Sequence, residues 1–450
     1  MTRNACGFGR IIWLSALIVL CALSTSVAEL RGHGGPVQTL AIADDGIHGL
    51  SGGFDYAVVY WDFQNSRALT RLLGHDGGVN AVAFIPNALS SPNQAVSGGD
   101  DGHIILWDLP RQSITLRFKG HEKRVVAVSA SPDGEIIASA AWDRSVRLWD
   151  IQNGQLLHSF AAGGNRPSAV VFTKNGRRVA ASNDLGEIRE WDVITGERTR
   201  LLRAHAFPIN ALALSGDGRI LASASVDMTI RLWQWPSAVE IALIELHDTA
   251  VLGLAMSQEG KLLASAGADG IIQLWSIPDG KPLGSLKGHI GAVWSVRFSP
   301  DGTKLYSAGR DEQIRIWDMA SLSEINPGGV HNIPQPERVA NMTEAEKRGQ
   351  WQFRKCRICH SVAKDSENRA GPSLYKVIGR PVGQLASYTY SPALRHADFI
   401  WTEQKIMELF LLGPQTITPG SKMPLQRLRN RGDVEDLMSY IRRVTGGRFE

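Results

Sequence analysis

Short apolar segments alternate with small and polar residues along most of the chain, and the pattern repeats. Each repeat has an alternating segment that ends in a turn, such as AVWSVRFSPDG, then a strand of small residues, such as LASASVD, then an apolar strand that ends in Trp. Short alternating strands separated by turn signals indicate antiparallel all-β blades. The Trp spacing is 46 residues once and 42 residues five times, which marks seven repeats: Trp61, Trp107, Trp149, Trp191, Trp233, Trp275 and Trp317.

Polar residues recur at fixed places in these repeats. Six repeats have an Asp six positions before the Trp: Asp55, Asp101, Asp143, Asp227, Asp269 and Asp311. Most repeats open with His, commonly after Gly, as at His289. A His, Ser and Asp trio is typical of hydrolases, but its recurrence in blade after blade indicates architecture. The fourth repeat departs from the pattern, with Gly164-Asn165 in place of Gly-His and Asp184 one position early, so we expect its blade to be held less tightly.

Residues 30 to 326 resemble WD40 repeats. The resemblance implies a seven-bladed β-propeller over residues 29–326, in which His, Ser, Asp and Trp form hydrogen-bond chains between the strands. It assigns this structural role to His75, Asp101, Trp107, His121, Asp143, Trp149, His289, Asp311 and Trp317. Propellers of this type bind proteins through their faces and central opening, so we expect a protein partner, which the sequence does not name.

The first 28 residues have the features of a cleaved signal peptide. Arg3 and Arg10 flank a positively charged start, an apolar run covers residues 11–23, and Ser26-Val27-Ala28 supplies the small residues of a cleavage site. Such a run is too short to cross a hydrocarbon core of about 30 Å comfortably. We therefore expect an exported protein whose mature chain has no integral membrane segment.

Cysteine use follows from this expectation. Two of the four cysteines, Cys6 and Cys21, lie in the leader, so the mature chain keeps Cys356 and Cys359. An exported protein with only these two has no disulfide framework, and the pair must serve another purpose.

A second domain is predicted after a Pro- and Gly-rich linker over residues 327–342. The segment TEAEKRGQWQF predicts a helix, with Thr343 and Glu346 as a capping box. It leads into Cys356-Arg357-Ile358-Cys359-His360, a spacing that suits covalent haem attachment with the imidazole as an iron ligand. Zinc would require a second ligand pair, for which no cysteine remains, and a thiol redox pair requires no following His.

From Thr343 to the C-terminus the chain resembles class I cytochromes c, in which Gly349 and Phe353 precede the haem peptide at the same spacing. The resemblance implies an all-α domain over residues 343–450 with one haem c attached to Cys356 and Cys359. It also implies His360 and Met423, in PGSKMP, as the axial ligands. It assigns support of the haem pocket to Pro372, as acceptor for the ligand His, to Arg380, Tyr390 and Trp401, near the propionates, and to Ser421.

Two departures from the cytochrome pattern affect how the protein tunes the haem, and neither removes a ligand of the iron. Phe410 stands where the family often has a Tyr that bonds to the Met sulfur, and Leu425 replaces an aromatic residue near the haem edge. Apolar residues at Val434, Leu437 and Ile441 predict a closing amphipathic helix.

Composition and charge complete the functional expectation. With 43% hydrophobic and 20% charged residues, the chain is neither disordered nor collagen-like. From Glu337 onward there are 19 Lys and Arg against 12 Asp and Glu, a net charge of +7, which favours a redox partner with an acidic docking surface over nucleic acid. The rest of the chain without the leader has a charge of about −5.

We therefore expect an electron carrier rather than an enzyme, and by resemblance a location in the periplasm of a Gram-negative bacterium. Two alternatives remain. In one, the propeller is the catalytic part of a redox enzyme that passes electrons to the haem. In the other, the protein is a haem-based redox or ligand sensor that signals through the propeller.

Overall fold

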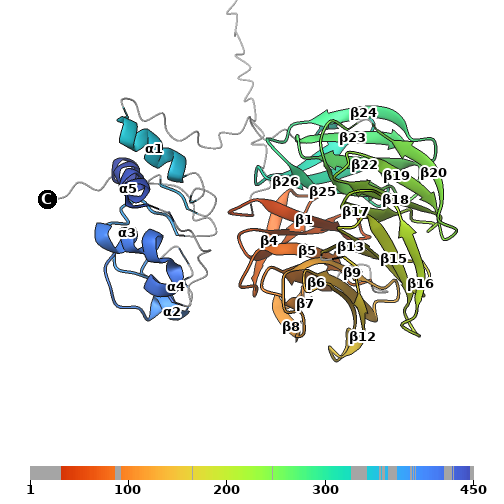
Figure 1. Ribbon diagram of the computed structural model, residues 1–450, viewed down its shortest axis with the longest axis horizontal. Coiled ribbons are helices and arrows are strands. Elements are labelled where there is room, and N and C mark those ends of the chain that lie inside the picture. Colours follow the sequence, from red (N-terminus) through yellow and green to blue (C-terminus); the bar gives the residue numbers. More distant parts are fainter. Residues whose placement is uncertain are drawn as a thin grey trace, which may run out of the picture.

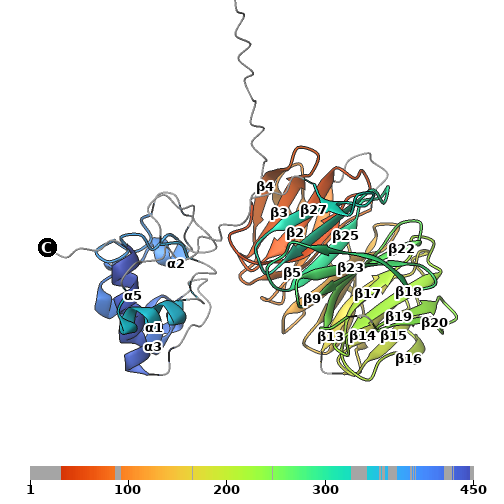
Figure 2. The same cartoon turned by 90° about the horizontal axis from the view of Figure 1, so that it is seen from above.

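The computed structural model describes two groups of elements. The described residues are 32–86, 93–164, 166–245, 247–325, 342–353, 356, 360–362, 372–385, 388, 390, 392–419, 428 and 430–445. The predicted signal peptide and all of the predicted linker except Met342 lie outside them. Seven sheets form a ring, and the helices form a group of their own (Figure 1, Figure 2).

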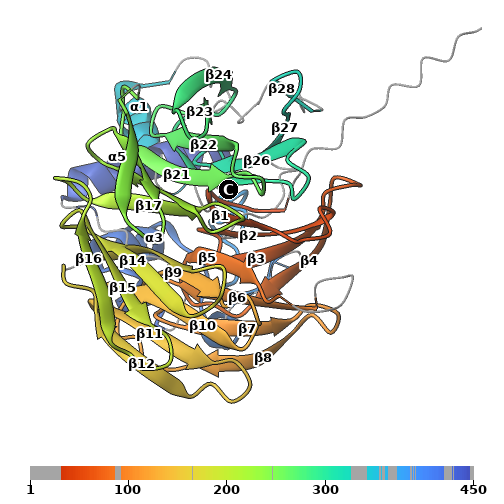
Figure 3. The same cartoon turned by 90° about the vertical axis from the view of Figure 1, so that its right-hand side faces the viewer.

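Each sheet is an antiparallel meander of four strands in chain order, and successive blades follow one another around the ring (Figure 3). The first three blades are β1 (Val37–Ile42), β2 (His48–Gly53), β3 (Ala57–Asp62) and β4 (Arg67–Leu73); β5 (Val79–Phe84), β6 (Gln94–Gly99), β7 (Ile104–Asp108) and β8 (Ser113–Phe118); β9 (Val125–Ala130), β10 (Ile136–Ala141), β11 (Ser145–Asp150) and β12 (Leu156–Ala161).

The next four blades are β13 (Pro167–Phe172), β14 (Arg178–Asn183), β15 (Glu187–Asp192) and β16 (Arg198–Arg203); β17 (Ile209–Leu214), β18 (Ile220–Ser225), β19 (Ile230–Gln234) and β20 (Val239–Ile244); β21 (Val251–Met256), β22 (Leu262–Gly267), β23 (Ile271–Ser276) and β24 (Lys281–Lys287); β25 (Val293–Phe298), β26 (Lys304–Gly309), β27 (Ile314–Asp318) and β28 (Ser323–Glu324). The predicted seven-bladed all-β propeller is confirmed.

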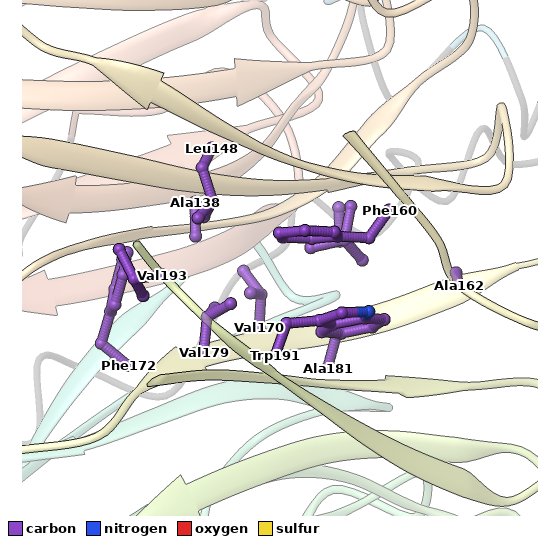
Figure 4. Close-up of a cluster of buried hydrophobic side chains, with 12 residues drawn as sticks. Ala138, Leu148, Phe160, Ala162, Val170, Phe172, Val179, Ala181, Trp191 and Val193 are labelled. Carbon is purple, nitrogen blue, oxygen red and sulfur yellow. The ribbon is translucent and has the colours of Figure 1, made fainter. Parts of the chain in front are cut away.

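Small residues in the second strand of each blade are explained by burial on both faces. In β10, β18 and β22, the last five residues are all buried, and they are mostly Ala and Ser. Neighbouring blades cover these strands, and larger side chains would push the blades apart. Bulkier apolar groups fill the space between blades instead, as where Phe160 stacks on Trp191 with ring centroids 5.0 Å apart (Figure 4).

A buried hydrogen-bond chain joins the strands of each regular blade. In the third blade, Trp149 Nε1 donates to Ser139 Oγ at 2.8 Å, and Ser139 Oγ lies 2.7 Å from His121 Nε2. The other ring nitrogen of His121 lies 2.8 Å from an Asp143 oxygen. Burial lowers the pKa of His121, so the imidazole is neutral; its Nδ1–H donates to the carboxylate and its Nε2 accepts from the serine.

The same arrangement occurs in other blades. His75 bonds to Ser97 at 2.7 Å and to Asp101 at 3.0 Å, while Trp107 donates to Ser97 at 2.8 Å. The corresponding His289 distances are 2.7 Å to Ser307 and 2.9 Å to Asp311, and Trp317 donates to Ser307 at 2.8 Å.

The fourth blade has a different network. Asn183 bonds to Glu187 at 3.1 Å and to the Ala162 carbonyl at 2.9 Å, and Arg189 contacts the same Glu187 oxygen at 2.9 Å. Ser182 shares a hydrogen bond of 2.9 Å with Ser168. Ala181 stands ten residues before Trp191, where the regular blades have the shared serine, so this blade has no hydroxyl to accept the indole N–H. The charged side chains of Glu187 and Arg189, which stand in place of the usual His, Ser and Asp hydrogen bonds, are therefore paired with each other.

Packing closes the ring between the first and last blades. The two-residue strand β28 pairs with β27 and completes the seventh blade from the same stretch of chain, so no strand is shared between blades in the described part of the propeller. Across this seam, Phe63 and Tyr306 have ring centroids 4.7 Å apart, and Leu40 N donates to Ser295 Oγ at 3.1 Å. A Cβ on Gly49 would lie 1.9 Å from the Phe63 ring, so glycine makes room for this contact.

The helical group comprises α1 (Glu344–Phe353), α2 (Pro392–Arg395), α3 (Glu403–Leu412), α4 (Pro414–Ile417) and α5 (Arg431–Thr445). The predicted capping box is confirmed, because Thr343 N donates to Glu346 at 2.7 Å and Glu346 N donates to Thr343 Oγ1 at 3.2 Å. The predicted closing helix is α5, which buries Val434, Leu437 and Ile441. Of the helices in the described ranges, none is both long and apolar enough to span a membrane.

A first prediction concerns the shared serine of a regular blade. Ser139→Ala removes the partner of both His121 and Trp149 and leaves two buried polar groups unsatisfied, so we expect a loss of about 2–4 kcal/mol in the free energy of unfolding. The control is Ser182→Ala on the second strand of the fourth blade, where the hydroxyl bonds to Ser168, and it should cost about 1 kcal/mol. Denaturant unfolding followed by circular dichroism measures both. Equal losses of unfolding free energy in the two variants would show that a serine shared by His and Trp contributes no more to stability than an ordinary buried serine.

A second prediction concerns pH. Burial lowers the pKa of His121, His205 and His247 in the folded protein, whereas the unfolded chain titrates near the ordinary value of about 6.5. The unfolded state therefore binds more protons as pH falls through this range, and the stability contribution present above about pH 6.5 is lost below it. The partner carboxylates Asp143 and Asp227 have lowered pKa values and stay ionised there.

The corresponding measurement is the denaturation midpoint at pH values between about 8 and 5. We expect a constant midpoint in the upper part of this range and a decline below about pH 6.5. A midpoint that rises on acidification would mean that the buried histidines gain protons on folding.

Candidate functional site

The candidate site begins at the C-terminal end of α1. Cys356 is buried there with 8% of its surface exposed, and its carbonyl accepts a hydrogen bond of 2.8 Å from the His360 backbone N–H. This hydrogen bond holds the backbones of the cysteine and the histidine close together. Cys359 lies outside the described residues, as do Ser421 and Met423.

His360 has a defined orientation. Its Nδ1 lies 2.8 Å from the carbonyl oxygen of Pro372, and because a carbonyl can only accept, Nδ1 carries the proton. Burial, together with the positive charge of Arg380, lowers the pKa of His360, against the opposing effect of the Pro372 bond. The imidazole is therefore neutral, with its Nε2 lone pair available to a metal.

The loop that supplies the Pro372 carbonyl is itself held by hydrogen bonds. Leu374 N donates to the Ser361 carbonyl at 2.8 Å, which ties the loop to the residue after the histidine. Arg380 donates through Nη2 to the Ser373 carbonyl at 2.7 Å and through Nη1 to the Tyr375 carbonyl at 3.4 Å. Sequence reasoning missed these two carbonyls, because no side-chain pattern marks a backbone acceptor.

Backbone pairing brings Arg380 next to Trp401. Gly379 N donates to the Trp401 carbonyl at 2.8 Å, and Trp401 N donates to the Arg380 carbonyl at 3.0 Å. Tyr390 is buried nearby, which raises the pKa of its hydroxyl, while the charge of Arg380 opposes that rise. Arg380, Tyr390 and Trp401 thus lie around one loop, although their predicted contact with propionates remains a prediction.

Helices α1 and α5 cross closely beneath this site. A Cβ on Gly349 would lie 1.9 Å from the Asp436 carbonyl oxygen, so only glycine permits the contact between the two backbones. Phe353 and Tyr440 pack together across the crossing, with ring centroids 5.3 Å apart. Tyr440, which is 2% exposed, was not among the predicted residues, although its helical spacing from Leu437 and Ile441 would have placed it on the buried face.

The residues present fit a haem better than a bare metal ion. The described part of the chain contains no group of three or more His, Cys, Asp or Glu side chains that could hold an ion by themselves. The buried Cys356 instead belongs to an apolar cluster that includes Phe353, Ile406 and Phe410, and the oriented imidazole of His360 lies four residues after it in the sequence. A porphyrin brings its own four nitrogen ligands and needs such an apolar pocket with an axial donor.

The polar residues of the propeller do not contribute to this site. The repeated His, Ser and Asp sets of the regular blades bond within their own sheets, as in the His75 and His289 sets. They hold strands together and are not assembled around a shared opening.

Comparison with known proteins agrees with this division into a propeller and a haem-type site. The family model described as WD domain, G-beta repeat matches residues 24–62, 66–108, 112–150, 196–234, 239–276 and 280–318, over half of the chain. The first three strands of the fourth blade fall in the gap between these matches, as the blade's altered hydrogen bonds would suggest.

The C-terminal region is similar to bacterial cytochromes c. Cytochrome c-550 of Nitrobacter winogradskyi is 31% identical over 93 residues, 21% of this chain and 84% of that protein. Cytochrome c2 of Agrobacterium tumefaciens is 32% identical over 97 residues, 21% of this chain and 86% of that protein. The Cytochrome c homolog of Rickettsia felis is 34% identical over 111 residues, 25% of this chain; the chain spans 61% of that relative's length.

The fold and the site define a β-propeller joined to a region of the haem-binding cytochrome type. The chain belongs to the WD40 repeat family through its propeller and to the cytochrome c family through its C-terminal region.

A third prediction tests the helix crossing. Gly349→Ala places a methyl group against the α5 backbone, so the helices must separate, at a cost of about 1–3 kcal/mol. The control is Gly432→Ala in α5, where the nearest atom to a new Cβ is 3.5 Å away and alanine should stabilise the helix by up to about 1 kcal/mol. Hydrogen exchange of α1 and α5 amides should be faster in the first variant only. Unchanged exchange in Gly349→Ala would show that the crossing adjusts freely.

Proposed function

We propose that this chain is an exported electron-transfer protein with one covalently bound haem c and a propeller that docks a protein partner. The proposed division is a signal peptide over residues 1–28, a propeller over 29–326, a linker over 327–342 and an all-α class I cytochrome c domain over 343–450. The observation that carries the proposal is the 2.8 Å contact between His360 Nδ1 and the Pro372 carbonyl, directly beside the cysteine peptide.

That contact orients the iron ligand. A hydrogen bond from Nδ1 fixes the tautomer and the plane of the imidazole, and it increases the basicity of the other nitrogen. Cys356 and Cys359 would form the thioether links that keep the haem in place. When bound, the haem supplies a centre that gains and loses one electron.

Met423 is proposed as the second axial ligand. Thioether sulfur is a neutral donor, and a His and Met pair raises the reduction potential of the iron. An iron with both axial positions filled exchanges electrons without exchanging ligands. This favours a carrier over an enzyme or a sensor of small gases.

The pocket residues would stabilise the charged haem propionates. Arg380 already uses two of its donors on the Ser373 and Tyr375 carbonyls, which holds its guanidinium in place. We propose that its remaining donors, with Tyr390, Trp401 and Ser421, serve the propionates. Buried carboxylates need such partners, because an unpaired buried charge is costly.

Charge and tethering indicate how the haem meets its partner. The C-terminal region from Glu337 has a net charge of +7 and would attract an acidic redox protein at low ionic strength. A partner held by the propeller would experience a raised effective concentration of the tethered haem region. We place this encounter in the periplasm of a Gram-negative bacterium, where haem c is attached to exported chains.

A fourth prediction tests the proposed ligation. Met423→Leu removes the thioether but keeps an apolar side chain of similar size, so the ferrous protein should become able to bind carbon monoxide and its midpoint potential should fall. Met407→Leu makes the same exchange on α3, where the side chain packs in the helical core, and should change neither property. Absorption spectra and a redox titration of the full-length protein measure both effects.

The same samples separate the alternatives. The wild-type protein should contain one iron per chain, show only haem c absorption and resist carbon monoxide. Binding of carbon monoxide by the wild type would favour a sensor, and additional cofactor bands would favour a redox enzyme. Either result would overturn the electron-carrier proposal.

A further inference from the structure

The seven inner strands of the propeller contain a single charged residue. These strands are β1, β5, β9, β13, β17, β21 and β25, and the charged residue is Arg297 in β25. Arg297 is the fifth residue of its strand and pairs with Tyr306, the third residue of the next strand. The fifth residue of the inner strand has the same pairing in every other blade. The six corresponding positions hold small or apolar residues: Ala41, Ala83, Ser129, Val171, Ala213 and Ala255.

Arg297 lines the central opening. A cavity of about 670 Å³ is bounded by inner-strand residues of all seven blades, among them Thr39, Ser129 and Arg297. A cavity of this size falls within the range that holds small organic ligands. Because its neighbours at the same level are mostly alanine, the long side chain of Arg297 stands where the other blades leave space.

Within the described residues, Arg297 has no carboxylate partner. Its one recorded hydrogen bond runs from Nη1 to the Val296 carbonyl at 2.7 Å. Burial lowers the pKa of its guanidinium, with no opposing effect from a nearby anion. Asp44 and Asp45 line the same cavity at the end of β1, but neither forms an ion pair with Arg297 among the described contacts, and Asp45 is engaged by the His48 ring at 2.6 Å.

Other partly buried arginines of the propeller are neutralised locally. Arg189 lies 2.9 Å from Glu187, Arg231 lies 2.6 Å from Glu240, and Arg315 lies 2.7 Å from Glu324. A cation that leaves water without a counter-charge is unfavourable, so these pairings are what the fold normally requires. Arg297 departs from that requirement, and it does so at the cavity that inner-strand residues of all seven blades line.

We propose that the central opening of the propeller binds a small organic oxyanion, whose carboxylate or phosphate oxygens pair with the Arg297 guanidinium. The planar guanidinium presents parallel N–H donors that match two oxygens of either group. Thr39 and Ser129 also line the cavity, and residues with hydroxyl groups are suited to the polar body of such a ligand. This site is separate from the haem region, and the inference does not rest on the proposed electron transfer.

Isothermal titration of the full-length protein with inorganic phosphate, succinate and citrate tests the proposal. At least one of these anions should bind the wild type, and its relative affinity for phosphate and for the two carboxylates identifies the preferred source of the oxyanion. Arg297→Ala should weaken binding by roughly 10- to 100-fold, the typical effect of losing hydrogen bonds to a charged group. The matched control is Arg219→Ala, which removes the same charge from a turn where the side chain is 84% exposed. It should leave binding unchanged.

Stability separates a binding role from a structural one. Four of the other six blades already have alanine at this position, so Arg297→Ala should fold and unfold at a denaturant concentration equal to or above that of the wild type. The bound anion should raise the unfolding midpoint of the wild type but not of this variant.

Three results would overturn the proposal. One is a lowered midpoint in Arg297→Ala, which would make Arg297 part of the fold. Another is equal loss of binding in Arg219→Ala, which would indicate a general charge effect. The third is failure of all three anions to bind the wild type at millimolar concentration, which would leave an acidic side chain of a protein partner as the alternative occupant.

Discussion

One buried serine hydroxyl connects the strands of a regular blade, and much of the propeller depends on it. In the third blade Ser139 lies on the second strand, receives the indole N–H of the third strand and bonds to the His121 imidazole, which arrives from the loop before the first strand. That imidazole in turn holds Asp143 at the turn between the second and third strands. Four separate parts of the blade are therefore fixed by one chain of short polar groups. Because the second strand is covered on both faces by neighbouring blades, a larger polar residue could not occupy the serine position.

The seam between the first and last blades shows what replaces a shared strand. Because β28 completes the seventh blade locally, the described residues join the ring at this point by side-chain packing and by the bond from the Leu40 N–H to Ser295 Oγ, not by strand pairing. Tyr306 stands where most other second strands have alanine, and it packs against Phe63, for which Gly49 leaves room. Two aromatic rings in contact, with a glycine that leaves room for one of them, thus fill the seam. The chain enters and leaves the ring on either side of it, so the C-terminal region is attached beside this junction.

The architecture was largely predictable because it is periodic. A regular Trp interval and recurring Asp, Ser and His identify the blades, and a capping box identifies the start of α1. The seam was not predictable, because Tyr306 is far in the sequence from Gly49 and Phe63, and none of the three residues carries a signal of its own. In the haem region, the cysteine peptide and His360 are local signals, whereas the Arg380 bonds to the Ser373 and Tyr375 carbonyls depend on a loop conformation with no side-chain signature. Cys359, Ser421 and Met423 lie outside the described residues, so their roles rest on the family resemblance.

Comparing equivalent positions in the seven blades also distinguishes residues that the propeller fold requires from residues found in a single blade. The fourth blade lacks the usual His and Asp, yet Asn183, Glu187 and Arg189 satisfy one another, so its departure is compensated within the blade. Arg297 is a departure of another kind. Six equivalent positions show that the inner strand needs no charge there, and the described residues around it provide no carboxylate partner. A charged residue whose counter-charge lies in the same blade needs no explanation beyond the stability of that blade. One that leaves a charge facing a shared cavity requires a counter-charge from outside the fold, and this makes the central opening chemically distinct from the seven sheets that enclose it.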